Sequence, residues 1–79
     1  MAKLDSIDLD LKARIAKRIK NLRESTGENQ SQFASAYDKD RQTLNRWETG
    51  RGATIYTINK FCAELKISLS DFFDDPLFK

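Results

Sequence analysis

The sequence contains no histidine, so the commonest general base and the commonest metal ligand of enzymes are both missing. Its single cysteine, Cys62, cannot form an internal disulfide. The three glycines, Gly27, Gly50 and Gly52, do not form a phosphate-binding loop. We therefore predict that the chain is not an enzyme, and that it holds neither a metal ion nor another cofactor.

Long apolar runs are also missing, so the sequence predicts neither a secretory signal nor a membrane span. A cytoplasmic location without a membrane partner follows by default. The 79 residues, 39% of them hydrophobic and 33% charged, correspond to one small globular domain with a modest core. We expect such a domain to be marginally stable, or to be helped by dimerisation.

The formal net charge is only +2, but the charges are unevenly distributed. The segment 12–23 holds six basic residues and no acidic one, namely Lys12, Arg14, Lys17, Arg18, Lys20 and Arg23. The end of the chain instead carries Asp71, Asp74 and Asp75. A basic first half favours a polyanionic partner, although an ordinary solvated helix can have the same composition.

The spacing of apolar residues predicts helices throughout, without strand alternation or repeats. The first helix should begin with Ser6 or Asp8 as its N-cap and end near Thr26, before Gly27. Its apolar stripe consists of Leu11, Ile15, Ile19 and Leu22. Asn29 should cap a second helix that ends around 37–38, with Gln32 completing a capping box. The inner face of that helix consists of Phe33, Ala34 and Tyr37.

Three further helices are expected, each with its own cap. Asp40 should cap the third helix, which Gly50 ends, and Thr54 should cap the fourth. The apolar face of the fourth helix consists of Ile55, Ile58, Phe61, Cys62 and Leu65. Ser68 and Asp71 suggest a capping box for a short fifth helix bearing Leu69, Phe72 and Phe73. Pro76 bars its continuation.

The predicted fold class is therefore all-α, a compact five-helix bundle in one domain, 1–79. Its core should extend over about 11–73, with 1–8 and 75–79 as flexible ends. Leu77 and Phe78 are more apolar than a solvated tail requires. They should either pack on a second subunit or be disordered.

The third predicted helix, 41–49, has one broad polar face. Plotted at about 100° per residue, five polar side chains fall within about 140°; they are Arg41, Gln42, Asn45, Arg46 and Thr49. Leu44 and Trp47 fall on the other side. Arg matches guanine O6 and N7, and Gln or Asn matches adenine N6 and N7. A solvated helix can show this face too, but two short helices joined by a tight turn favour a helix-turn-helix unit.

Several short segments occur together in a characteristic order. They are Arg23, Asn29-Gln30, Phe33-Ala34, Thr43-Leu44-x-Arg46-Trp47-Glu48-x-Gly50 and Ile67-Ser68-Leu69-x-x-Phe72-Phe73. In this order and spacing the chain resembles the Cro/repressor (XRE-like) helix-turn-helix family over about 15–73. The resemblance implies a lambda repressor-like DNA-binding domain whose third helix enters the major groove.

The resemblance also implies roles for individual residues. It places base contacts at Arg41, Gln42 and Arg46, with Asn45 at the rim of the same face. It places phosphate contacts at Gln30, Thr43 and Arg51, to which the basic segment 12–23 adds Lys17. Arg23 and Glu48 match a structural ion pair that links the first helix to the third.

Four features depart from the family pattern. Asp38 stands where the turn usually has glycine, and Lys39 stands where a small apolar residue is usual. Glu28 occupies a position that is commonly apolar. The loop after Gly50 is one residue short and lacks the usual proline. The geometry of the turn and the phosphate contacts of the loop are therefore left open.

The resemblance implies a sequence-specific regulator of transcription that binds double-stranded DNA, associates with the nucleoid and is expected to act as a repressor. A homodimer on a pseudo-palindromic operator would compensate for the few base contacts of so small a domain. One alternative is the antitoxin of a toxin–antitoxin pair or the controller of a restriction–modification operon. An antitoxin needs a surface for its toxin, for which the Leu77–Phe78 end is the candidate. An alternative of another class is a helical protein-interaction module without DNA binding.

Overall fold

The structure, a computed structural model, describes residues 5–79, which form five α-helices, one 3₁₀ helix and no strand. The elements are α1 (Ser6–Ser25), α2 (Gln30–Ala36), α3 (Arg41–Glu48), α4 (Ile55–Leu65), α5 (Leu69–Phe73) and η1 (Pro76–Phe78). The predicted all-α fold of five helices is confirmed. In the part of the chain that the structure describes, no helix is long and apolar enough to cross a membrane.

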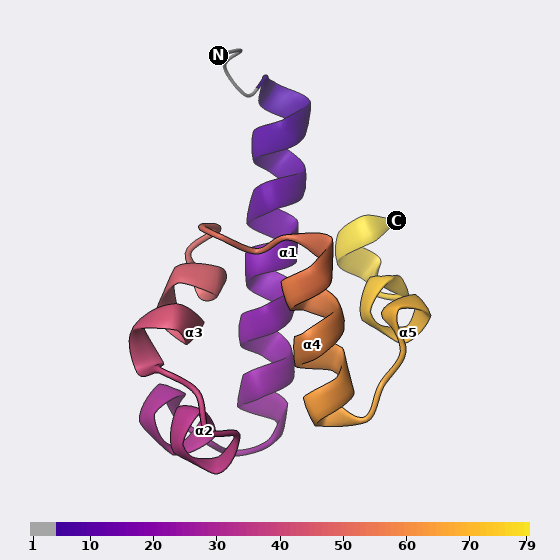
Figure 1. Ribbon diagram of the computed structural model, residues 1–79. Coiled ribbons are helices and arrows are strands. Elements are labelled where there is room, and N and C mark those ends of the chain that lie inside the picture. Colours follow the sequence, from indigo (N-terminus) through magenta and orange to yellow (C-terminus); the bar gives the residue numbers. More distant parts are fainter. Residues whose placement is uncertain (1–4) are drawn as a thin grey trace.

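The long helix α1 is the axis of the molecule (Figure 1). α2 and α3 lie on one side of it, and α4, α5 and η1 lie on the other. Contacts connect α1 with α3 and with η1, α2 with α3, and α4 with α5. The N-terminal part of α1 projects beyond the other helices, so only the remainder of this helix contributes to the core (Figure 1).

Aromatic side chains make up half of the core cluster, which contains residues of every α-helix. It consists of Ile19, Phe33, Leu44, Trp47, Ile58, Phe61, Cys62 and Phe72. Phe61 is central, because its ring centroid lies 5.7 Å from that of Phe33 and 6.5 Å from that of Trp47. Burial raises the pKa of the Cys62 thiol, consistent with its role as a small apolar residue of this core.

Two residues that the periodicity assigned to the core are exposed instead. Leu11 is 48% exposed and Ile55 is 50% exposed. Leu11 lies in the N-terminal half of α1, beside the loop that precedes α4, and Ile55 is the first residue of α4. Periodicity identifies the apolar face of a helix, but not how far the neighbouring helices extend along it.

Most helix starts follow the predicted capping chemistry. Asn29 and Ser68 form complete capping boxes, and the side chains of Asp40 and Thr54 accept hydrogen bonds from the first turns of α3 and α4. The predicted cap of α1 was wrong, because Asp5 caps this helix by accepting a 2.9 Å hydrogen bond from the backbone of Asp8. Asp5, Ser6 and Asp8 are all residue types that are favoured at an N-cap, so residue type alone did not show which of them begins the helix.

Replacing Asn29 tests the start of α2. Asn29→Ala removes the acceptor of the 2.8 Å hydrogen bond from the Gln32 backbone and should lower the free energy of unfolding by about 1 kcal/mol. Asn29→Asp keeps an acceptor and should stay close to the parent. Urea unfolding monitored by circular dichroism measures both. Equal unfolding midpoints for Asn29→Ala and the parent would show that this cap does not stabilise the domain.

The end of the chain packs on the domain rather than forming the expected flexible end. The guanidinium of Arg18 donates to the carbonyls of Phe72 (2.7 Å) and Asp71 (3.0 Å) and pairs with Asp75 (3.1 Å). The ring centroid of Phe78 lies 6.2 Å from that of Phe72. Pro76 does not extend α5 but begins η1, a position that suits its fixed φ.

The expected flexible segment at the start of the chain lies partly outside the described residues. Residues 1–4 are not described, whereas Asp5 and the segment 6–8 form the cap and the first residues of α1.

Candidate nucleic-acid interface

The turn between α2 and α3 tolerates both of its departures from the family pattern. Asp38 adopts the left-handed conformation, with φ of 51°, that glycine would supply more easily. The Lys39 ammonium reaches Glu64 on α4 (Nζ–Oε1 2.6 Å) and lies 5.0 Å from the ring centroid of Trp47. The backbone of Lys39 donates a 2.7 Å hydrogen bond to the carbonyl of Ala34, closing the turn. The two helices are therefore held together without the usual turn sequence.

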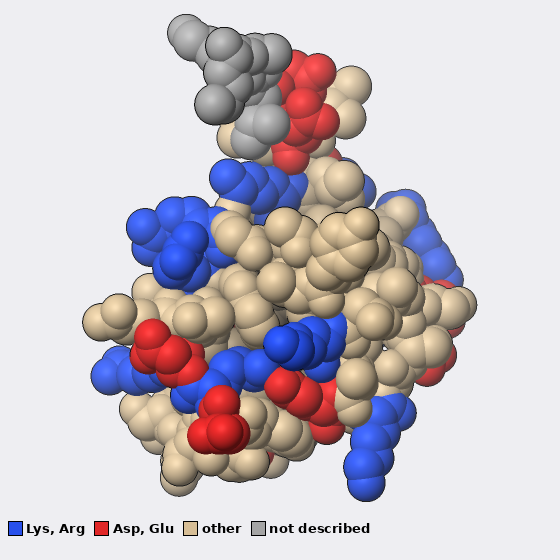
Figure 2. Space-filling model, viewed as in Figure 1, with Lys and Arg blue, Asp and Glu red and all other residues tan. Residues whose placement is uncertain are grey.

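α3 presents the predicted polar face to solvent. Leu44 and Trp47 are 0% and 7% exposed and attach the helix to the core. The four predicted base-contacting side chains on the opposite side are exposed; they are Arg41, Gln42, Asn45 and Arg46. Together with Gln30 and Arg51 they line one shallow depression, and none of these described lining residues is acidic. Figure 2 shows basic side chains over α3 and the loop after it, with acidic side chains beside them towards the start of α3.

The loop after α3 folds back over the end of the polar face of α3. Gly50 and Gly52 both have positive φ, 85° and 72°, so the loop turns sharply without a proline. The backbone of Arg51 donates a 2.7 Å hydrogen bond to the carbonyl of Arg46. A Cβ on Gly52 would lie only 3.4 Å from a guanidinium nitrogen of Arg46. The loop therefore places Arg46 and Arg51 next to each other at one end of the depression.

A buried ion pair fixes the other face of α3 to α1. Arg23 donates through Nε to Glu48 Oε2 (2.7 Å) and through Nη2 to Oε1 (3.1 Å). The two side chains are 9% and 3% exposed, and the hydrogen bond to Glu48 raises the pKa of Arg23 above its ordinary value. Nη1 of Arg23 donates to the backbone carbonyl of Glu28 (2.8 Å). Glu28 departs from the family pattern, but it contributes to this network through its backbone and not through its side chain.

Gln30 extends this network to the exposed face. Its side-chain Nε2 lies 3.2 Å from Glu48 Oε1 and 3.2 Å from Asn45 Oδ1. The family resemblance implied a phosphate contact at Gln30, but the sequence did not predict its hydrogen bonds to Asn45 and Glu48. The partners are 15 and 18 residues away, and only the packing of α2 on α3 brings them together.

The remaining predicted phosphate contacts lie outside the depression. Thr43 is half-buried on the flank of α3. Lys17 is exposed on α1 and lies with Lys20 beside Glu48 and Thr49, at the C-terminal end of α3. A cation there is favourably placed for a helix C-terminus and remains accessible to a phosphate.

The basic field of α1 is smaller than its composition suggested. Arg14 pairs with Asp10 (2.8 Å), and Arg18 and Arg23 form the structural contacts described above. The other three basic residues of the segment have no carboxylate partner among residues 5–79; they are Lys12, Lys17 and Lys20. Half of the expected cations are therefore already neutralised within the domain.

A comparison with protein families places most of the chain in one of them. The profile of a family described as helix-turn-helix matches residues 19–72, about two thirds of the chain. The matched segment contains α2, α3 and every residue that lines the depression. No curated protein and no solved structure matches the chain.

Proposed function

The chain belongs to the Cro/repressor (XRE-like) helix-turn-helix family of DNA-binding domains, and on this premise we propose that it is a sequence-specific regulator of transcription. The depression along α3 is the observation that carries the proposal. Three arginines and three side-chain amides line it, without a carboxylate among these described residues. A duplex offers a surface of the complementary kind, with anionic phosphates beside base edges that donate and accept hydrogen bonds.

In this proposal α3 lies in the major groove. Arg41, Gln42 and Arg46 contact base edges, and Asn45 contacts a base at the rim of the face. Phosphates are held by the first turn of α2 at Gln30, by Thr43 and Arg51, and by Lys17. Because the amino group of Gln30 is engaged within the domain, the backbone N–H of this residue is the group offered to a phosphate.

We also propose that two copies bind a pseudo-palindromic operator, with half-sites about one helical turn apart. One short recognition helix makes few base contacts, so a second copy would raise both affinity and specificity. Bound at a promoter, such a dimer would exclude other proteins from the same DNA, and we therefore propose that it acts as a repressor.

The antitoxin alternative has less support. Its candidate toxin-binding surface was the end of the chain, but Phe78 packs against Phe72 and Phe73 of its own domain, with ring centroids 6.2 and 5.0 Å away. The interaction-module alternative would be supported if the chain failed to bind DNA.

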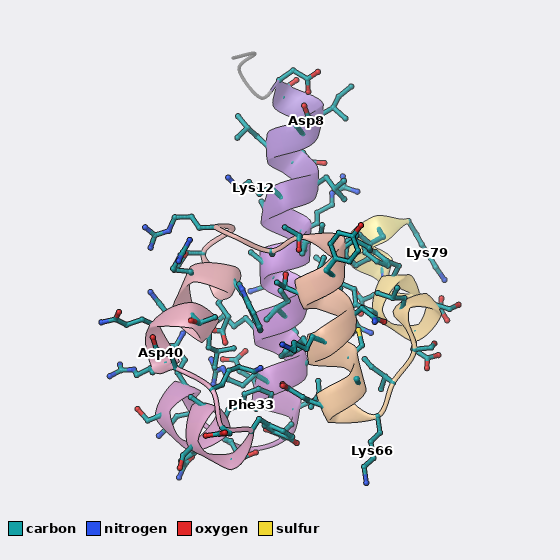
Figure 3. All side chains as sticks on the ribbon, viewed as in Figure 1. Asp8, Lys12, Phe33, Asp40, Lys66 and Lys79 are labelled. Atoms are coloured by element: carbon teal, nitrogen blue, oxygen red, sulfur yellow. The ribbon has the colours of Figure 1, made fainter. Side chains whose placement is uncertain are left out.

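Removing one cation tests the role of α1. Lys17→Gln should weaken binding to all duplexes nearly equally and make the slope of log K against log salt shallower by about 1, because one phosphate contact is lost. Fluorescence anisotropy between about 50 and 200 mM salt measures this slope. Lys66→Gln is the matched control, since Lys66 extends from the end of α4, away from α3 (Figure 3). A slope that changes equally in both variants would contradict a contact at Lys17.

A further inference from the structure

The side chain of Gln30 controls which end of the Asn45 amide can face a base. We propose that Gln30 is a positioning residue that makes Asn45 read guanine or thymine instead of adenine. The inference rests on the proposed function, because it specifies what one residue of the recognition face reads. It goes beyond the resemblance, which offers Asn45 only as an amide suited to adenine.

The carboxylate of Glu48 is held by Arg23 in a two-point ion pair. Both carboxylate oxygens accept hydrogen bonds from the guanidinium, at 2.7 and 3.1 Å, and the pair is nearly inaccessible to solvent. As the carboxylate partner of a guanidinium, Glu48 can only accept hydrogen bonds. The Gln30 atom that lies 3.2 Å from Glu48 Oε1 must then be the amide nitrogen, not the oxygen.

The orientation of the Gln30 amide in turn fixes that of Asn45. The same nitrogen of Gln30 lies 3.2 Å from the Asn45 amide, so the atom of Asn45 at that point must be the oxygen that accepts. The two N–H groups of Gln30 are thereby used, one for Glu48 and one for Asn45. The orientation of the two amides follows from the charge of Glu48 rather than from an arbitrary choice between oxygen and nitrogen.

The orientation of the Asn45 amide determines which base edges it can contact. Asn45 is exposed, and its Oδ1 is turned towards α2, so its Nδ2 amino group is the end available to a base edge. An amino group alone matches acceptors, which guanine presents as O6 and N7 and thymine presents as O4. Adenine also presents an acceptor, N7, but its N6 amino group would face the amino group of Asn45 without an acceptor, and cytosine presents only a donor. Asn45 should therefore favour guanine or thymine.

Selection from a random duplex library tests the proposal with four proteins: the parent, Asn45→Ala, Gln30→Met and Gln30→Lys. The Asn45→Ala variant identifies the base position that depends on Asn45, and the parent should prefer guanine or thymine there. Gln30→Met keeps a side chain of similar length without N–H donors, so it should shift that position towards adenine by about 5- to 100-fold. Gln30→Lys keeps a donor for Glu48 and Asn45 and should retain the preference of the parent. The matched control is Ser31→Ala, an exposed neighbour on α2, which should leave the motif unchanged.

A purely structural role for Gln30 would change affinity or stability, but not the identity of one base. A parent that prefers adenine at the Asn45-dependent position, or a Gln30→Met variant with an unchanged motif, would overturn the inference. If Asn45→Ala left the motif intact, the inference would fail while the proposed function stood. A parent that selected no sequence would overturn both.

A measurement on the free protein tests the underlying contact without DNA. In a ¹⁵N–¹H spectrum, Asn45→Ala should shift the side-chain amide resonances of Gln30 and leave those of Gln32, whose carbonyl oxygen accepts from the Asn29 backbone at 3.0 Å. Unchanged Gln30 resonances would show that the contact is absent and would overturn the inference, whatever the DNA selection gave.

Discussion

Glu48→Ala should lower the free energy of unfolding by about 3–5 kcal/mol, because it leaves the Arg23 guanidinium buried without its carboxylate. Arg23 is only 7% exposed. Without Glu48, the hydrogen-bond acceptor that its guanidinium retains is the backbone carbonyl of Glu28. The loss is a large fraction of the stability of a small domain. Urea unfolding measures it, and a midpoint equal to that of the parent would contradict the buried pairing.

Two comparisons identify the cause of this loss. The double variant Arg23→Met with Glu48→Leu replaces both charges by apolar side chains and should lose much less stability than Glu48→Ala. Arg14→Met breaks an exposed pair, whose side chains are 42% and 59% exposed, and should change stability by about 1 kcal/mol or less. If Arg14→Met and Glu48→Ala lost equal stability, burial would not be the reason for the effect.

Gln42→Ala should weaken binding to the preferred operator by about 1–3 kcal/mol and broaden the sequence preference at one position of each half-site. Gln42 is exposed on α3, lines the depression together with Arg41 and Arg46, and carries no charge. Binding to random DNA, which depends on phosphate charge, should therefore change little. Competition binding with operator and random duplexes separates the two effects.

The matched control for Gln42→Ala is Asn59→Ala, which removes another exposed neutral amide, on α4. It should leave both affinities unchanged. If Gln42→Ala selected the same sequences as the parent with the same strength, α3 would not be the element that reads the bases.

Local signals predicted most of the fold. Asn29, Asp40, Thr54 and Ser68 each cap the helix that they were expected to cap, because a cap depends on only a few neighbouring residues. The packing of the end of the chain could not be predicted in this way. It depends on hydrogen bonds from Arg18 to residues more than 50 positions away, which no local pattern contains.

In the candidate site, too, features that depend on local spacing were predictable, and features that depend on packing between helices were not. A 3.6-residue period separates the exposed Arg41 from the buried Leu44, so the polar face of α3 was visible in the sequence. The bonds of Gln30 to Asn45 and Glu48 depend on how α2 crosses α3, which the spacing along each helix does not give. The number of unpaired cations on α1 was overestimated, because composition counts charges without showing which of them are paired. Arg18, for example, pairs with Asp75.

The most direct test of the central claim is selection from a random duplex library by the full chain at about physiological salt, with sequencing of the bound fraction. The proposal predicts a two-fold symmetric motif with half-sites about one helical turn apart. A single half-site would keep α3 as the reader but contradict the dimer. No enrichment over random DNA would contradict sequence-specific recognition itself.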